Sequence, residues 1–158
     1  MTAAPTNAAP IDLDQLDPGC FIKIPAGEKI FLEDDAGRAM YIVRSGRVDI
    51  ITYGTVLENV GPGGIFGEMA LIDDGPRSAA AIASVDTEVA SIDKGMFVDL
   101  VRRHPEFALF VMRLLAVRLQ NLNSLSGAHE VRFDMAPLSA AGVFLITGPT
   151  GAGKSTLL

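Results

Sequence analysis

The fold is decided by residues 21–64, which read FIKIPAGEKIFLEDDAGRAMYIVRSGRVDIITYGTVLENVGPGG. Short apolar runs in this stretch are separated by the turn-forming groups Pro-Ala-Gly, Asp-Asp-Ala-Gly, Ser-Gly and Gly-Pro-Gly-Gly. Residues 79–83 and 88–92 are two further apolar runs. Together the runs predict about seven or eight strands, and their regular spacing is typical of a sandwich or barrel. We therefore expect a mainly β fold.

After Lys94 the apolar residues recur with a helical period. Residues 96–103 predict a short helix that ends or bends at His104-Pro105, and Pro105 suits the first turn of a longer helix to about residue 125. The long helix has two apolar stripes, and each needs a partner. One partner is the β domain, and the other is a ligand, a neighbouring helix or a second subunit; alternatively, the helix is packed entirely by its own domain. The stripes are Met112, Leu115, Leu119 and Leu122, and Phe107, Phe110, Leu114 and Val117.

The composition limits the classes of partner. The 158-residue chain has a formal net charge of -6, which argues against non-specific binding to nucleic acid and against an anionic membrane surface. Cys20 is the single cysteine, and no metal-ligand spacing joins the two histidines. No apolar run approaches the roughly 20 residues of a membrane-spanning helix. We expect a soluble, cytoplasmic protein of one ordinary domain, without a metal site.

Residues 64–80, GIFGEMALIDDGPRSAA, are unusual for a connection between two strands. Gly67 allows a close approach of the backbone, and the apolar piece after Glu68 is long enough for one helical turn. The Asp-Asp-Gly-Pro group reverses the chain, and Arg77 then supplies a planar fork of donors that suits a phosphate. Taken alone, Glu68 and Arg77 are open to a second interpretation, an ion pair that braces a turn.

The segment resembles the phosphate-binding cassette of the cyclic-nucleotide-binding domain family, which includes catabolite-activator-type regulators and protein kinase A regulatory subunits. That cassette runs Gly-Glu-x-Ala-Leu and then Pro-Arg-x-Ala, and it is matched by residues 67–71 and 76–79. Residues 25–31 and 40–48 are similar to the family's early strands. The resemblance covers about residues 20–125 and implies a jelly-roll β-barrel with flanking C-terminal helices.

The resemblance also implies roles for individual residues. Glu68 would accept a hydrogen bond from the ribose 2′-hydroxyl, and Arg77 would pair with the cyclic phosphate. Backbone N–H groups near Gly67, Ala70 and Ala79 would complete the cradle. The ligand-binding residues expected on this basis are Phe66, Gly67, Glu68, Met69, Ala70, Arg77, Ser78 and Ala79.

The base of the ligand is predicted less directly. Ser78 stands where cGMP-selective relatives often carry Thr, whereas Arg-Ser-Ala is frequent in bacterial relatives that bind cAMP. We therefore expect cAMP, with cGMP as the alternative ligand. Candidates to cover the base are the polar residues of the last helix, Arg118, Gln120 and Asn121, which a solvated helix face would also explain.

Residues 148–155, GPTGAGKS, match the Walker A pattern after a short apolar run. Residues 131–158 resemble the start of the SMC-like DNA-repair exonuclease ATPases. No acidic Walker B strand follows this motif in the sequence, so we expect no phosphoryl transfer from it. The tail is interpreted as a fragment of such an ATPase.

These observations predict three parts: a flexible segment at residues 1–19, a cyclic-nucleotide-binding domain at 20–126 and a tail with the truncated P-loop at 127–158. The expected function is non-enzymatic sensing of a cyclic nucleotide. The last helix would be the output element and a candidate surface for homodimerisation, with an output protein that the sequence does not identify. The alternatives are a regulatory barrel attached to a truncated P-loop ATPase and a barrel used only for protein interaction.

Overall fold

The computed structural model describes residues 8–126, and side chains are described up to Gln120. The chain divides after Leu114 into two compact units, and the first contains every strand of the described residues. The strands are β1 (Phe21–Ile24), β2 (Lys29–Phe31), β3 (Ala39–Ser45), β4 (Val48–Thr52), β5 (Thr55–Val60), β6 (Ile65–Phe66), β7 (Ala80–Ala83) and β8 (Thr87–Asp93). The helices are α1 (Met69–Ile72), α2 (Lys94–Arg103) and α3 (Pro105–Ser126), preceded by 3-10 turns at Leu13–Gln15 and Pro18–Cys20.

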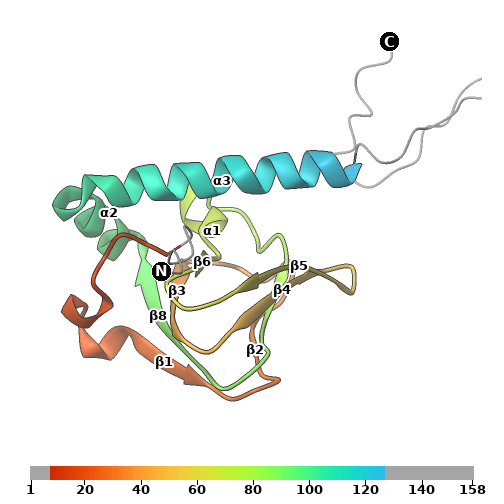
Figure 1. Ribbon diagram of the computed structural model, residues 1–158, viewed down its shortest axis with the longest axis horizontal. Helices are drawn as coiled ribbons and strands as arrows, with labels where there is room; N and C mark the ends of the chain where they lie inside the picture. Colours follow the sequence, from red (N-terminus) through yellow and green to blue (C-terminus); the bar gives the residue numbers. More distant parts are fainter. Residues whose placement is uncertain (1–7, 127–158) are drawn as a thin grey trace, which may run out of the picture. The chain divides into compact units, whose positions relative to one another are not determined.

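The strands form two four-stranded antiparallel sheets, one in the order β1-β8-β3-β6 and the other in the order β2-β7-β4-β5 (Figure 1). Eight strands divided between two sheets by long crossovers are the arrangement of a jelly roll. The prediction of a mainly β fold with C-terminal helices is confirmed. The strands pair in two separate sheets, one of the two arrangements, sandwich or barrel, that their spacing predicted, and β6 lies in one sheet and β7 in the other.

The core lies between the apolar faces of the two sheets. In β3, Val43 and the half-buried Tyr41 belong to the cluster between the sheets, whereas Met40 and Ile42 alternate with them and are buried on the opposite face of the strand. Val43 and Phe66 from the first sheet join Val48 and other residues of the second in one buried cluster. Phe31 and Tyr41 pack at the edge of this cluster, next to the segment that connects β6 to β7.

The helices begin where the sequence provides caps. Asp93 precedes α2, and its side chain accepts a hydrogen bond of 2.8 Å from the Met96 N–H, so the helix starts two residues earlier than predicted. Pro105 opens α3 as predicted. Within the first unit α3 buries Phe107, Val111 and Leu114.

Both apolar stripes of α3 contain exposed residues: Val117 of the stripe with Phe107 is 52% exposed, and the stripe with Met112 is exposed at Met112 and Leu119. Met112 is 56% exposed and Leu119 is 60% exposed, whereas Phe107 and Leu114 of the other stripe are buried. Leu122 of this stripe lies beyond the residues whose side chains are described. The alternative in which the helix is packed entirely by its own domain therefore does not hold for Met112, which belongs to the first unit. Within residues 8–126, no helix is long and apolar enough to cross a membrane.

Candidate functional site

The cassette, residues 64–80, connects the two sheets through one helical turn. It leaves β6, passes Gly67 and Glu68, and forms α1 over Met69–Ile72, which is the turn predicted from the sequence. Asp73 closes α1 by donating its N–H to the Met69 carbonyl at 3.0 Å, and its carboxylate accepts the Gly75 N–H at 2.9 Å. The chain reverses there and enters β7. Glu68 and Arg77 thus lie on either side of one short helix and one tight turn.

Glu68 and Arg77 are both buried, which is rare for charged residues. Glu68 is 4% exposed at the start of α1, and Arg77 is 5% exposed just before β7. Burial lowers the pKa of Arg77, and the negative charge of Glu68 is one of the influences that oppose this shift. Arg77 belongs to none of the salt bridges found among residues 8–126.

The Arg77 guanidinium is held by backbone carbonyls. Its Nη1 donates to the Gly67 carbonyl at 2.8 Å, and its Nη2 donates to the Ala39 carbonyl at 2.7 Å. The Arg77 backbone is fixed as well: its N–H donates to the Asp35 carbonyl at 2.8 Å, and its carbonyl accepts the Asp34 N–H at 2.9 Å. Gly67 in the cassette and Ala39 at the start of β3 therefore hold the side chain. The β2–β3 loop holds the backbone of Arg77.

One donor of this guanidinium has no partner. Nε of Arg77 is buried and has no hydrogen-bond partner among the described residues. Burial lowers the pKa of Arg77, whereas the Tyr41 hydroxyl and the carboxylates of Asp35 and Glu68 raise it. Arginine remains protonated through the physiological range. The site thus holds a buried cation outside any salt bridge of the described residues, an arrangement that is costly unless an anion binds there.

Aromatic rings lie next to the guanidinium. Its central carbon lies 4.0 Å from the centroid of Phe31 and 5.7 Å from that of Tyr41. Phe31 lies 5.9 Å from both Tyr41 and Phe66, and Tyr41 stacks on Phe66 at 5.2 Å. A cation over an aromatic face within about 6 Å is attracted by the ring quadrupole. The three rings therefore form a shelf, here called the aromatic shelf, under Arg77.

Two glycines allow the close packing around Arg77. An ideal Cβ on Gly67, whose φ is +73°, would lie 2.7 Å from Nη1 of Arg77. An ideal Cβ on Gly37 would lie 2.7 Å from Nε of Arg77 and 2.5 Å from the Ala70 Cβ. Both positions are too crowded for a side chain, so the guanidinium is enclosed by backbone at Gly37 and Gly67 and by the face of Phe31.

The other predicted site residues divide by exposure. Phe66, Ala70 and Ala79 are buried, and they form the wall of the cassette. Met69 is 39% exposed and Ser78 is exposed, so their side chains are accessible to a ligand or to solvent. Arg118, Gln120 and Asn121, the candidates to cover a base, belong to the part of α3 after Leu114 and stay predictions.

Sequence reasoning missed the residues that hold Arg77 from a distance. Phe31, Gly37, Ala39 and Tyr41 come from β2, the β2–β3 loop and β3. The residues at 33–35 give the sequence signal of a solvated turn, and Asp34 and Asp35 are indeed exposed. The bonds to Arg77 come from the backbone of this turn, which leaves no mark in side-chain composition.

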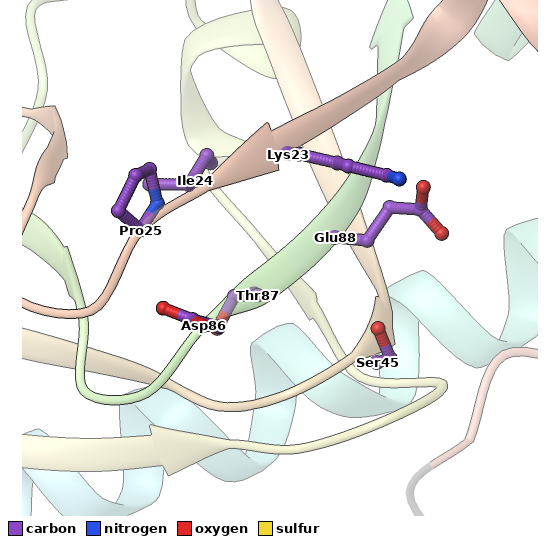
Figure 2. Close-up of a pocket in the computed structure, with 7 residues that line it drawn as sticks. All are labelled: Lys23, Ile24, Pro25, Ser45, Asp86, Thr87 and Glu88. Carbon is purple, nitrogen blue, oxygen red and sulfur yellow. The ribbon is translucent and has the colours of Figure 1, made fainter.

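A hollow in the surface lies outside the cassette. It has a volume of about 530 Å³ and is lined by residues of β1, of β8 and of the β7–β8 turn, with Ser45 at the end of β3 (Figure 2). Figure 2 shows the Lys23 and Glu88 side chains extending to the same side. Thr87 at its edge hydrogen-bonds to Arg47 and Val85. None of its residues belongs to the cassette. In the described part of the chain no cluster of His, Cys, Asp or Glu has the arrangement of a metal site.

Comparison with known proteins gives separate matches for two parts of the chain. The model of the family described as "Cyclic nucleotide-binding domain" matches residues 21–104. The chain is 41% identical over 101 residues to the cyclic AMP receptor protein of Thermus thermophilus, which covers 61% of this chain and 47% of that protein. It thus spans about half the length of this curated relative.

Solved structures give the same result. The catabolite activator protein of Thermus thermophilus superposes with a TM-score of 0.61 at 37% identity, covering 70% of this chain and 55% of that one. A structure from a cyclic-GMP-dependent signalling pathway that regulates bacterial phytopathogenesis gives a TM-score of 0.57 at 34% identity, covering 64% of this chain and 84% of that one.

The C-terminal part matches a different group. The model of the family described as "AAA domain" matches residues 116–158. Over 47 residues the chain is 64% identical to one of the subunits of the nuclease SbcCD of Pseudomonas aeruginosa, covering 30% of this chain and 4% of that protein. The predicted P-loop at residues 148–155 falls in this match and lies outside the described residues.

Proposed function

Because the chain belongs to the cyclic nucleotide-binding domain family, we propose that its cassette binds a cyclic nucleotide, preferably cAMP, and that the module is a sensor without catalytic activity. Arg77 pairs with the cyclic phosphate, and Glu68 accepts a hydrogen bond from the ribose 2′-hydroxyl. The remaining predicted residues of the cassette line the pocket. A cytoplasmic location fits a ligand of this kind and a chain with one cysteine, Cys20.

The observation that carries this proposal is the buried Arg77 cation, whose Nε has no hydrogen-bond partner among the described residues and which joins no salt bridge there. A phosphate supplies the missing negative charge and several acceptor oxygens. Charge-assisted bonds from a guanidinium to phosphate are shorter and stronger than neutral ones. Glu68 complements this arrangement, because a buried carboxylate accepts hydrogen bonds from hydroxyl groups but repels an anion.

The choice of cAMP rests on Ser78 and on the relatives. Ser78 is exposed, so its hydroxyl can reach a ligand. The Thermus thermophilus relative is a cyclic AMP receptor protein, which supports cAMP. A similar structure comes from a cyclic-GMP-dependent pathway, and cGMP is therefore the alternative ligand.

A thermal-shift panel of cAMP, cGMP, cyclic CMP and ATP tests the proposal. Binding to the folded state alone raises its stability by RT ln(1 + [L]/Kd), so about a 100-fold excess over Kd adds about 2.7 kcal/mol. We expect cAMP to raise the melting temperature most and 2′-deoxy-cAMP to raise it less, since the deoxy analogue cannot donate to Glu68. If no cyclic nucleotide changes the melting temperature, the proposal is wrong, and a β domain used only for protein interaction is favoured.

The C-terminal match supports a second function, regulation of an attached P-loop ATPase. In that case the β domain would control nucleotide use at the P-loop of residues 148–155, which includes Lys154. We expect this chain alone to hydrolyse no ATP above background in a phosphate-release assay. Hydrolysis that disappears in Lys154→Ala would overturn this expectation and establish the ATPase function.

An exposed apolar face of α3 supports a second copy of the chain as a partner. Leu109, Met112 and Leu119 are each more than half exposed, and their spacing of three and seven residues puts them on one helix face. We expect a dimer in sedimentation velocity that Met112→Lys converts to a monomer, because a buried ammonium without a partner is costly. Arg113→Gln, a change at an exposed neighbour, should leave the dimer intact. A monomeric wild-type chain would contradict the dimer.

A further inference from the structure

The aromatic shelf beneath Arg77 has a specific task. We propose that Phe31 is a positioning residue for ligand binding: its ring fixes the plane of the Arg77 guanidinium and stabilises the cation without neutralising it. The inference rests on the proposed function of the cassette, and it adds a residue of β2 that lies 46 positions before Arg77 in the sequence.

The geometry separates what the carbonyls do from what the ring does. The Gly67 and Ala39 carbonyls accept from the two terminal nitrogens, at 2.8 and 2.7 Å, and these bonds lie along the N–H directions of the guanidinium. The Phe31 ring lies instead beneath the central carbon, which is 4.0 Å from the ring centroid. Because a guanidinium is planar, contacts at the nitrogens and contact on the face restrict different rotations.

The ring is itself held in place. Phe31 is half-buried and lies 5.9 Å from both Tyr41 and Phe66, which belong to the other sheet. On Gly67, an ideal Cβ would lie 3.3 Å from the Phe31 ring, so the start of the cassette also packs on it. A ring fixed by three neighbours is a rigid support, whereas a flexible aliphatic side chain would let the guanidinium tilt.

The chemistry of the support explains why an aromatic ring suits this position better than an acid. A carboxylate under Arg77 would stabilise the cation but would also neutralise it, and it would repel an incoming phosphate. A ring attracts the cation through its quadrupole and leaves the full positive charge for the ligand. The unpaired Nε of Arg77 is consistent with a cation that is positioned but not yet neutralised.

Calorimetric titration of cAMP into three variants tests this role. We expect Phe31→Leu to weaken binding about tenfold and Phe31→Tyr, which keeps the ring, to bind within about twofold of wild type. The matched control is Phe21→Leu, because Phe21 also supports an arginine, Arg44, at 4.5 Å but lies outside the cassette. The control should bind within about twofold of wild type. Phe31→Met replaces Phe31→Leu if the leucine variant does not fold.

A spectroscopic readout separates positioning from general loss of packing. In the free protein the Nε–H proton of Arg77, assigned by its absence in Arg77→Lys, should be shifted upfield by the ring current of Phe31. The shift should persist in Phe31→Tyr and vanish in Phe31→Leu. Unchanged affinity in Phe31→Leu, or an Nε–H signal that does not move, would overturn the inference. If the wild-type protein does not bind cAMP, the proposed function is wrong. The Nε–H signal of the free protein would still show whether Phe31 positions Arg77.

Discussion

Replacing Arg77 by alanine is expected to weaken cAMP binding at least tenfold. A charge-assisted hydrogen bond contributes about 1.5–3 kcal/mol net, and a factor of ten in Kd corresponds to about 1.4 kcal/mol. The change also leaves the Gly67 and Ala39 carbonyls without the donors they have now, so the free energy of unfolding should fall by about 2 kcal/mol. Isothermal calorimetry measures the affinity, and denaturant melts measure the stability.

The variant Arg77→Lys tests whether the positive charge alone is enough for binding. Lysine keeps the charge but has a single ammonium group, which cannot bond to both carbonyls and to a phosphate in one plane. We expect its affinity to lie between those of wild type and Arg77→Ala. Calorimetry should be done well below the melting temperature of each variant, so that a loss of binding is not a loss of folding. Unchanged affinity in Arg77→Ala would reject the assignment of the cassette.

Gly37→Ala is expected to have the second largest effect, although Gly37 itself supplies no side chain. The added Cβ would lie 2.5 Å from the Ala70 Cβ and 2.7 and 2.8 Å from Nε and Cζ of Arg77, so α1 or the guanidinium must shift. Overpacking of this kind costs about 1–3 kcal/mol of stability. We expect cAMP affinity to fall about tenfold, because the guanidinium leaves the position fixed by Gly67, Ala39 and Phe31.

Gly61→Ala is the control for this change. A Cβ on Gly61 would meet no atom within 4 Å, and its φ is outside the left-handed region, so the substitution is structurally permitted. Its stability should stay within about 0.5 kcal/mol of wild type, with unchanged affinity. If Gly37→Ala bound cAMP as the control does, the confinement of Arg77 by the β2–β3 loop would be of no consequence for the ligand.

Local signals in the sequence account for most of the fold. Turn residues separate the strands, and Pro105 marks the start of α3, so these elements are predicted near their observed positions. The sequence does not predict the two-residue strand β6, because Ile65 and Phe66 are too few to show a period. Its pairing with Tyr41 and Ile42 of β3 is a tertiary effect. The predicted start of α2 is two residues late, because the apolar period begins only at Met96.

The site is predictable only in part. Local motifs point to Glu68 and Arg77, and the structure places both in the interior, where their burial supports a ligand role without testing it. The groups that hold Arg77 could not be predicted, because Ala39 contributes a carbonyl and Gly37 contributes only space. Backbone groups are the same in every residue, so a site built from them has no compositional signal.

The connection of the two sheets by the cassette limits how this protein can vary in length. β6 is anchored to β3, β7 is anchored to β2 and β4, and Ala36 bridges to Pro76 between them. Inserting or deleting a residue between Glu68 and Arg77 would therefore rotate one of them out of the site, since neither anchored end can slide. The turn between β4 and β5 has no such restraint, because Tyr53 is 84% exposed there. Peptides inserted into the β4–β5 hairpin should leave the protein folded, whereas peptides inserted into the cassette should disrupt the site.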